Sequence, residues 1–211
     1  MDQAVRDVLA EYEARANAES EVMAGLSIAD FAHRIDDFLI CVGPDTGQLL
    51  HILARSVQAK HLVEIGASYG YSTIWLADAA RETGGKVHSF ELSQKKVDFA
   101  REKLRSLGLQ DYVEFYVGDA LKNLPQLDAQ LDLVLIDCWK SLYIPAFKLI
   151  APKLSQGALV VADNMLYPVE TQHDAQKYQA HVRDYMDMES LLLPVGSGIE
   201  ITRKRGSVRA Q

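Results

Sequence analysis

Two apolar runs that end abruptly in oxygen-bearing side chains constrain the fold of this chain more than any other feature. Leu131–Ile136 is followed directly by Asp137, and the run that begins at Ala158 ends in Asp163 and Asn164. A buried parallel strand has this pattern where it reaches the carboxyl edge of its sheet. Ligands of open α/β sheets bind at that edge. If the two strands are neighbours, their side-chain oxygens converge and form a site for a hard cation.

Strands and helices alternate strictly from His61 onward. The predicted strands cover residues 61–65, 86–90, 113–117, 131–136 and 158–161, and the predicted helices cover residues 72–80, 93–107, 143–154 and 171–186. Alternating βα units imply a mostly parallel sheet with helices on both faces. Residues 191–195 and 199–203, separated by Gly196-Ser197-Gly198, are typical of a terminal antiparallel hairpin.

The first forty residues are predicted to be helical. Helical periodicity runs from residue 4 to residue 24, and Ser27 is a candidate cap for a second helix that reaches about residue 39. Residues 42–47 interrupt the helical pattern before an amphipathic stretch over 48–57. A chain of 211 residues that is 48% hydrophobic can bury one substantial core. We therefore expect one domain over 1–211, with a helical cap at 1–40 and a core at 42–204.

The charge of the chain narrows the classes of partner. A formal net charge of −7 argues against a general affinity for nucleic acid or anionic membranes, and the short basic run at 203–205 is the one exception.

No apolar run approaches the length of a membrane span, and the first residues carry acids, unlike a targeting peptide, so we expect a cytoplasmic protein. Cys41 and Cys138 have no disulfide or metal-ligand spacing and are expected to be reduced thiols.

The first strand-to-helix turn, Glu64–Ser72, contains Gly66 and Gly70. Glycines at such a turn let the backbone approach a ligand, and the amides at the start of the helix can donate to it. The turn lacks Gly-Lys-Ser/Thr, which excludes a P-loop, and it lacks the glycine of the dinucleotide fingerprint that lets a pyrophosphate sit against the helix.

Acidic residues end the next two strands. Glu91 can accept both hydroxyls of a ribose, although it also fits a surface acid before a helix capped by Ser93. Asp119 can accept a hydrogen bond from the amino group of an adenine, although it fits an ordinary aspartate of a turn equally well. Three successive strand ends of this kind predict a nucleoside site. NAD, flavin and S-adenosylmethionine would all use one, and the glycine spacing disfavours the dinucleotides.

With these motifs in this order, residues 42–204 resemble the class I S-adenosylmethionine-dependent methyltransferases, whose fold is Rossmann-like. More narrowly, the chain resembles the cation-dependent O-methyltransferases, the group of catechol O-methyltransferase and caffeoyl-CoA O-methyltransferase. The segments Asp137-Cys138-Trp139-Lys140 and Ala162-Asp163-Asn164 are the closest to the catechol enzyme.

The resemblance implies a role for each motif residue. S-adenosylmethionine would be bound by Val42, Glu64, Gly66, Ser72, Glu91, Asp119, Ala120 and Asp137. Mg²⁺ or another divalent cation would be held by Asp137, Asp163 and Asn164, with Lys140 as the general base. The acceptor would meet Trp139, Lys140, Asn164 and Glu200. Two positions depart from the catechol enzyme, because Cys138 replaces a histidine beside the adenine and Asp119 replaces a hydroxyl and amide pair.

The chemistry explains why these residue types are needed. Methyl transfer from a sulfonium to oxygen is an in-line displacement that requires a deprotonated, aligned acceptor. A phenolic hydroxyl titrates near pH ~10, by analogy with tyrosine. A divalent cation that coordinates a vicinal diol lowers that value and orients the oxygen, and Lys140 can then take the proton.

The leading hypothesis is therefore a Mg²⁺-dependent O-methyltransferase for a small aromatic vicinal diol, such as a catechol. A hydroxylated tRNA nucleoside, which the basic run at 203–205 motivates, or a hydroxylated natural product remain alternative acceptors. A non-catalytic nucleotide-binding protein and a nicotinamide oxidoreductase remain alternatives of other classes. The amphipathic N-terminal helices could seal the site, form a homodimer face, or do both.

Overall fold

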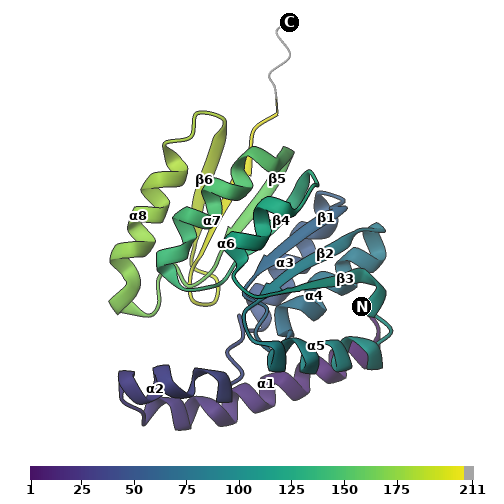
Figure 1. The fold of residues 1–211 in the computed structure, drawn as a ribbon, viewed down its shortest axis with the longest axis vertical. Coiled ribbons are helices and arrows are strands. Elements are labelled where there is room, and N and C mark those ends of the chain that lie inside the picture. The colour runs from purple at the N-terminus through teal and green to yellow at the C-terminus, as the bar shows by residue number, and fades with distance from the viewer. Residues whose placement is uncertain (207–211) are drawn as a thin grey trace, which may run out of the picture.

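A mixed sheet forms the centre of the molecule (Figure 1). The computed structural model describes residues 1–206, except for the side chains at positions 28, 29 and 32. In this part of the chain the sheet has seven strands in the order β3-β2-β1-β4-β5-β7-β6. The strands are β1 (His61–Ile65), β2 (Lys86–Glu91), β3 (Val113–Val117), β4 (Leu131–Ile136), β5 (Leu154–Ala162), β6 (Met188–Leu193) and β7 (Ile199–Lys204). The first five run parallel, and β7 pairs antiparallel with both β5 and β6.

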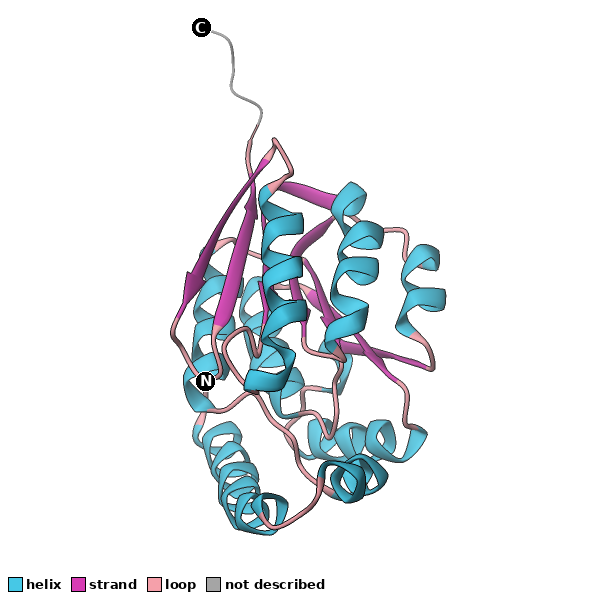
Figure 2. Cartoon of the chain, turned by 90° about the vertical axis from the view of Figure 1, so that its left-hand side faces the viewer, coloured by secondary structure: helices cyan, strands magenta, loops and turns pink. Residues whose placement is uncertain are grey.

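Helices cover both faces of this sheet (Figures 1 and 2). They are α1 (Gln3–Ala24), α2 (Ile28–Arg34), α3 (Pro44–Ser56), α4 (Tyr71–Thr83), α5 (Gln94–Ser106), α6 (Ala120–Asn123), α7 (Tyr143–Ile150) and α8 (Gln172–Arg183). Side chains on β4 alternate between the two faces: Leu133 and Leu135 join a core with α1, α3, α4 and α5, whereas Val134 and Ile136 join a core with α7 and α8. The buried strands are apolar on both sides because each face is covered.

The N-terminal helices lie together at the foot of the view in Figure 1. The first half of α1 buries Val5, Leu9 and Tyr12 against the body of the protein. Ser27 caps α2, as predicted, by accepting a hydrogen bond from the backbone of Asp30. A 3-10 turn at Ile35–Asp37 follows α2 and brings the chain back toward the sheet.

The predicted fold class is confirmed, with corrections to the ends of several elements. Helix α3 begins at Pro44 and not at residue 48, because proline at the first helical position lacks only an amide that would have no partner within the helix. The helix predicted to reach residue 39 ends at Arg34, and β5 begins at Leu154 instead of residue 158. The expectation of one domain over 1–211 includes residues 207–211, which lie outside the described residues, and it stays a prediction.

The register of the central strands aligns their carboxyl ends. Ile65 of β1 pairs with Ile136 of β4, which in turn pairs with Ala162 of β5. The backbone amide of Asp137 donates to the carbonyl of Ile65 at 3.0 Å, and the amide of Asp163 donates to the carbonyl of Ile136 at 3.1 Å. The residues that follow β1, β4 and β5 therefore leave the sheet side by side.

Candidate active site

The carboxylates of Asp137 and Asp163 follow β4 and β5 and lie at the carboxyl edge of the sheet. Asp163 is buried, and its Oδ1 accepts a hydrogen bond from the amide of Asn164 at 2.6 Å. Its Oδ2 is buried and has no hydrogen-bond partner within residues 1–206. Burial raises the pKa of Asp163, and the carboxylate of Asp137 raises it further. Burial also raises the pKa of Asp137, with Lys140 opposing the shift. The positive charge of Lys140 is therefore outweighed by burial and does not stabilise both ionised forms.

Lys140 follows β4 and reaches back to the end of β5. Its Nζ donates to the backbone carbonyl of Asp163 at 2.7 Å and to the hydroxyl of Tyr143 at 2.6 Å. Burial lowers the pKa of Lys140 to about 8, and the nearby Asp137 and Asp163 partly oppose the shift. An amine with a pKa close to the working pH can accept a proton, as a general base must.

Tyr143 lies beside Lys140 and Asp163 and belongs to none of the sequence motifs. Its ring is fully buried, and its hydroxyl donates to the carbonyl of Asp163 at 3.0 Å while accepting from Lys140. The signal in the sequence was its position, because it begins helix α7 three residues after Lys140. Its hydroxyl fixes the direction of the lysine side chain.

Asn164 and Trp139 flank this cluster. Asn164 adopts a φ of 56°, in the left-handed region that asparagine tolerates better than most residues. The residue is half-buried. Trp139 is 57% exposed, which leaves its ring available to a bound molecule.

The first strand-to-helix turn, residues 64–72, is called the glycine turn below. It packs directly against the end of β4. Gly66 has a φ of +101°, and a Cβ atom there would lie 1.9 Å from the carbonyl oxygen of Asp137. The amide of Ser68 donates to Oε2 of Glu91 at 2.8 Å, and the amide of Ser93 donates to Oε1 of the same carboxylate at 2.9 Å. Glu91 therefore ties β2 to the turn, and both of its oxygens point toward backbone donors at the carboxyl edge.

Glu64 is buried inside β1, beneath the turn. Oε2 accepts hydrogen bonds from the hydroxyls of Thr73 and Ser89, both at 2.6 Å, and the hydroxyl of Ser72 also stabilises the ionised carboxylate. Oε1 is buried without a partner among the described residues. Burial raises the pKa of Glu64 to about 7 despite these donors. An orphaned carboxylate oxygen at this point fits a positively charged or hydrogen-bonding group of a ligand.

Glu64→Gln should change the pH dependence of stability. The folded pKa of about 7 lies above the ordinary value of 4.5, so the ionised side chain destabilises the empty protein progressively between these pH values and by a constant amount above them. We expect the free energy of unfolding of the variant, relative to wild type, to rise by about 2 kcal/mol from pH 5 to pH 8. Urea unfolding at both pH values measures this, with the exposed Glu170→Gln as control. A difference that does not vary with pH would contradict it.

The remaining predicted cofactor residues lie around the same edge. Asp119 caps helix α6, its Oδ1 accepting from the amide of Leu121 at 3.0 Å, so its turn role is present in the structure. Ala120 begins that helix and is half-buried. Val42 is buried just before α3, and its carbonyl lies beside Gly196 in the turn between β6 and β7.

Glu200 lies on β7, where it pairs with Ala162 of β5, the residue before Asp163. It is fully buried on β7 and faces helix α8, where Arg183 donates at 2.9 Å and Gln179 at 3.1 Å. The hydroxyl of Ser190 donates to the same carboxylate at 2.6 Å. The carboxylate is thus fully engaged in attaching α8 to the hairpin. Its predicted contact with an acceptor hydroxyl stays a prediction.

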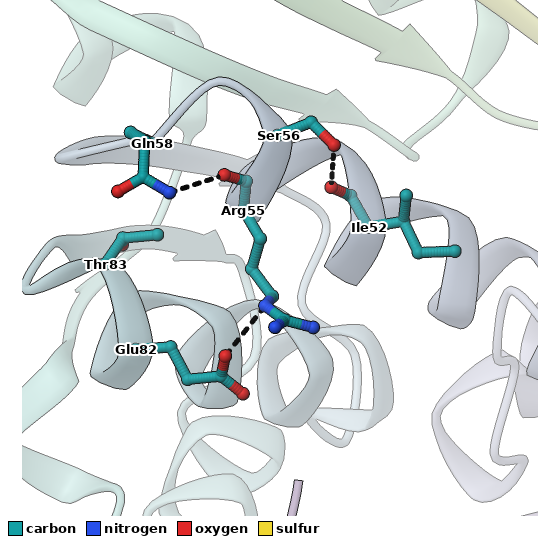
Figure 3. A pocket seen from close by; sticks show the side chains of 6 residues that line it. All are labelled: Ile52, Arg55, Ser56, Gln58, Glu82 and Thr83. Atoms are coloured by element: carbon teal, nitrogen blue, oxygen red, sulfur yellow. Dashed lines mark hydrogen bonds and ion pairs between the residues drawn. The ribbon is translucent and has the colours of Figure 1, made fainter.

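A separate polar cluster lies at the opposite end of helices α3 and α4. His51, Asp78 and Glu82 bring potential metal-ligating atoms within 4.8 Å of one another. Arginines already pair with both acids, Arg81 with Asp78 and Arg55 with Glu82 at 2.7 Å. Figure 3 shows the second pair in a cavity of about 350 Å³, which the last turns of the two helices line. Because α4 leads to the start of β2, this cavity is remote from the carboxyl edge, and its charges are balanced internally.

None of the described helices combines the length and the apolar character that crossing a lipid bilayer requires.

Known proteins resemble this chain in fold and in sequence. The O-methyltransferase TomG of Streptomyces achromogenes, solved in complex with SAM and involved in tomaymycin synthesis, superimposes with a TM-score of 0.75 at 28% identity, over 93% of this chain and 99% of that one. The fold is that of the Rossmann-like methyltransferases. Residues 13–205 also match the family model described as O-methyltransferase. The chain belongs to this O-methyltransferase family.

Two groups of known enzymes are similar to this chain in sequence, the catechol O-methyltransferases and the caffeoyl-CoA O-methyltransferases. A catechol O-methyltransferase of Mycobacterium tuberculosis is 38% identical over 128 residues, which is 60% of this chain and 58% of the relative. Another, from Niastella koreensis, is 34% identical, and the match spans 59% of its length. Caffeoyl-CoA O-methyltransferase 2 of Populus trichocarpa is 28% identical over 79% of this chain and 75% of the relative. The match thus spans a little under three fifths of the length of the catechol O-methyltransferases.

Proposed function

We propose that this protein is a divalent-cation-dependent O-methyltransferase that moves a methyl group from S-adenosylmethionine to a hydroxyl of an aromatic vicinal diol. The observation that carries the proposal is the buried Oδ2 of Asp163, which has no partner among the described residues although Asp137 and Lys140 lie beside it. A buried carboxylate oxygen without a partner is unfavourable unless a cation or donor is supplied from outside.

The donor set fits a hard cation. Asp137, Asp163 and Asn164 would hold it through two carboxylates and an amide oxygen, the ligand types that Mg²⁺ and Ca²⁺ prefer. The raised pKa values of both aspartates support the assignment, because a bound cation would favour their ionised forms. When bound, the cation would lower the pKa of an acceptor hydroxyl and the cofactor would provide the methyl group.

The residues of the glycine turn would hold the cofactor. Gly66 lets the backbone approach, Glu91 offers carboxylate oxygens to ribose hydroxyls, and Glu64 supplies its orphaned oxygen from below. Val42, Ser72, Asp119, Ala120 and Asp137 would complete this part of the site. The resemblance of the chain to TomG, which was solved with SAM, supports the cofactor.

Lys140 would take the proton from the acceptor hydroxyl. Its lowered pKa of about 8 favours this role, and its contacts with Tyr143 and the Asp163 carbonyl hold Nζ beside the carboxylates. The exposed ring of Trp139 would form a wall for an aromatic acceptor.

A hydroxylated natural product is a second candidate acceptor. Trp139 is 57% exposed and Tyr167, after β5, is 59% exposed, so the carboxyl edge presents aromatic surface that a larger molecule could cover. The basic run at 203–205 supports RNA less, because Arg203 pairs with Glu189 at 3.1 Å across the hairpin.

The test is methyl transfer from labelled S-adenosylmethionine to 3,4-dihydroxybenzoic acid and caffeic acid, with Mg²⁺ and with EDTA. We expect product with Mg²⁺ and a loss of at least about 100-fold after chelation, because both the acidity and the orientation of the acceptor depend on the cation. Full activity in EDTA would remove the cation from the proposal. Transfer to neither diol, by a sample that binds the cofactor, would direct the search to larger acceptors.

A further inference from the structure

The helical cap at residues 1–40 contacts the glycine turn through residues that belong to none of the sequence motifs. Tyr69 lies in the middle of the turn, between Ser68 and Gly70, and is only 4% exposed. Its ring packs edge-on against Phe99 of α5 at 5.3 Å, and the guanidinium of Arg15 lies 4.9 Å above it. A residue of the proposed cofactor turn is thus enclosed by the cap and α5.

Two hydroxyl groups join the cap to this residue. The hydroxyl of Tyr12, on α1, donates to the backbone carbonyl of Tyr69 at 2.9 Å in a buried position. The hydroxyl of Tyr69 donates in turn to the backbone carbonyl of Asp36, in the 3-10 turn after α2. We call this chain of contacts, Tyr12 to Tyr69 to Asp36, the tyrosine clasp.

An ion pair holds the far end of the clasp. The carboxylate of Asp36 lies 2.8 Å from Nζ of Lys96 on α5, and Lys96 is buried apart from 7% of its surface. The same ammonium lies 5.6 Å from the centre of the Tyr69 ring. The 3-10 turn is therefore attached both to the glycine turn and to the helix beside it.

The tyrosine clasp holds the backbone of the glycine turn, which is part of the proposed cofactor site. Ser68 has a φ of 47°, a conformation that is unfavourable for serine and that needs contacts on both sides to persist. On one side its amide donates to Glu91, the proposed ribose ligand, at 2.8 Å. On the other side the next residue is Tyr69, whose carbonyl the Tyr12 hydroxyl holds. Segment 38–42, which ends in the proposed cofactor residue Val42, follows directly from the Asp36 end of the clasp.

We propose that Tyr69 and Tyr12 are positioning residues that hold the glycine turn in the conformation that binds the cofactor. This inference rests on the proposed function. The cap is then part of the cofactor site, and loss of a clasp hydroxyl weakens cofactor binding, because the free protein must order the turn when the ligand binds. Turnover of the fully bound enzyme changes little, since both hydroxyls bond backbone carbonyls and neither contacts Lys140 or the proposed cation ligands.

The test measures the dissociation constant of S-adenosylhomocysteine for the full chain by calorimetry. We expect Tyr69→Phe and Tyr12→Phe each to raise it by about 3- to 10-fold, the range of one lost hydrogen bond. The kcat at saturating cofactor should stay within about twofold of wild type. Tyr116→Phe is the matched control, because it also removes one tyrosine hydroxyl bond, to His88 at 3.2 Å, away from the turn. Asp36→Asn, at an exposed side chain, should shift the constant in the same direction even if a tyrosine variant folds poorly.

The result that would overturn the clasp is an unchanged dissociation constant in folded Tyr69→Phe and Asp36→Asn proteins, even with a lower melting temperature. Equal effects in Tyr116→Phe would also overturn it. S-adenosylhomocysteine is the demethylated form of the cofactor, and measuring its binding needs no turnover. A wild type that binds it but methylates no diol therefore contradicts the proposed acceptor and leaves this test intact. A wild type that binds no S-adenosylhomocysteine overturns both proposals.

Discussion

Replacement of Lys140 by methionine is expected to lower the kcat of methyl transfer by about 10²- to 10⁴-fold, the range attributed to a positioned general base. Methionine keeps an unbranched apolar side chain of similar length, so the half-buried stem of the lysine is replaced without a large cavity. What is lost is Nζ, together with its hydrogen bonds to Tyr143 and to the carbonyl of Asp163. Initial rates at saturating diol and cofactor measure the effect.

A nearby lysine provides the control for this experiment. Lys148 lies exposed on α7, the helix that begins just after Lys140, and Lys148→Met should leave kcat unchanged. Binding of S-adenosylhomocysteine to Lys140→Met should match wild type, since Lys140 is not among the proposed cofactor residues. A variant that keeps more than about a tenth of wild-type kcat would assign proton removal to the solvent or another group.

Asp163→Asn should give two effects of opposite sign. The substitution replaces a charged cation ligand by a neutral amide oxygen, and we expect both divalent-cation affinity and methyl transfer to fall by at least about 100-fold, more than the loss of an outer-shell partner causes. The metal-free variant should nevertheless unfold at a higher temperature than wild type at neutral pH. Burial and the Asp137 carboxylate raise the pKa of Asp163, so its ionised form is unfavourable in the empty protein, and asparagine carries no charge.

Thermal unfolding with and without Mg²⁺ separates these effects. Wild type should be stabilised by the cation, because binding to the native state adds to its stability, whereas Asp163→Asn should not respond. Asp128→Asn, at an exposed position, should behave as wild type in every measurement. An Asp163→Asn protein that still gains stability from Mg²⁺ would place the cation elsewhere.

The sequence alone was sufficient to predict the parallel core of the sheet and the edge at which the candidate active site lies. Leu131–Ile136 and the run before Asp163 are strands for a local reason, since continuous apolar, β-branched segments bury both faces of a sheet. Their acids mark the carboxyl edge because an acid farther inside a buried strand is unfavourable unless it has buried hydrogen-bond partners, as Glu64 has. The same local chemistry gave the Ser27 cap and the hairpin around Gly196-Ser197-Gly198.

The tertiary structure alone decided where each side chain points and what it meets. An acid on an edge strand has no sequence signal for its partners, so only packing revealed that Glu200 binds Arg183 and Ser190 under α8. Tyr12 and Tyr69 are 57 residues apart, and their hydrogen bond depends on the docking of α1 against the turn. Periodicity and residue type report which face of an element is buried, but contacts between distant elements depend on strand register and helix placement, which the whole core determines together.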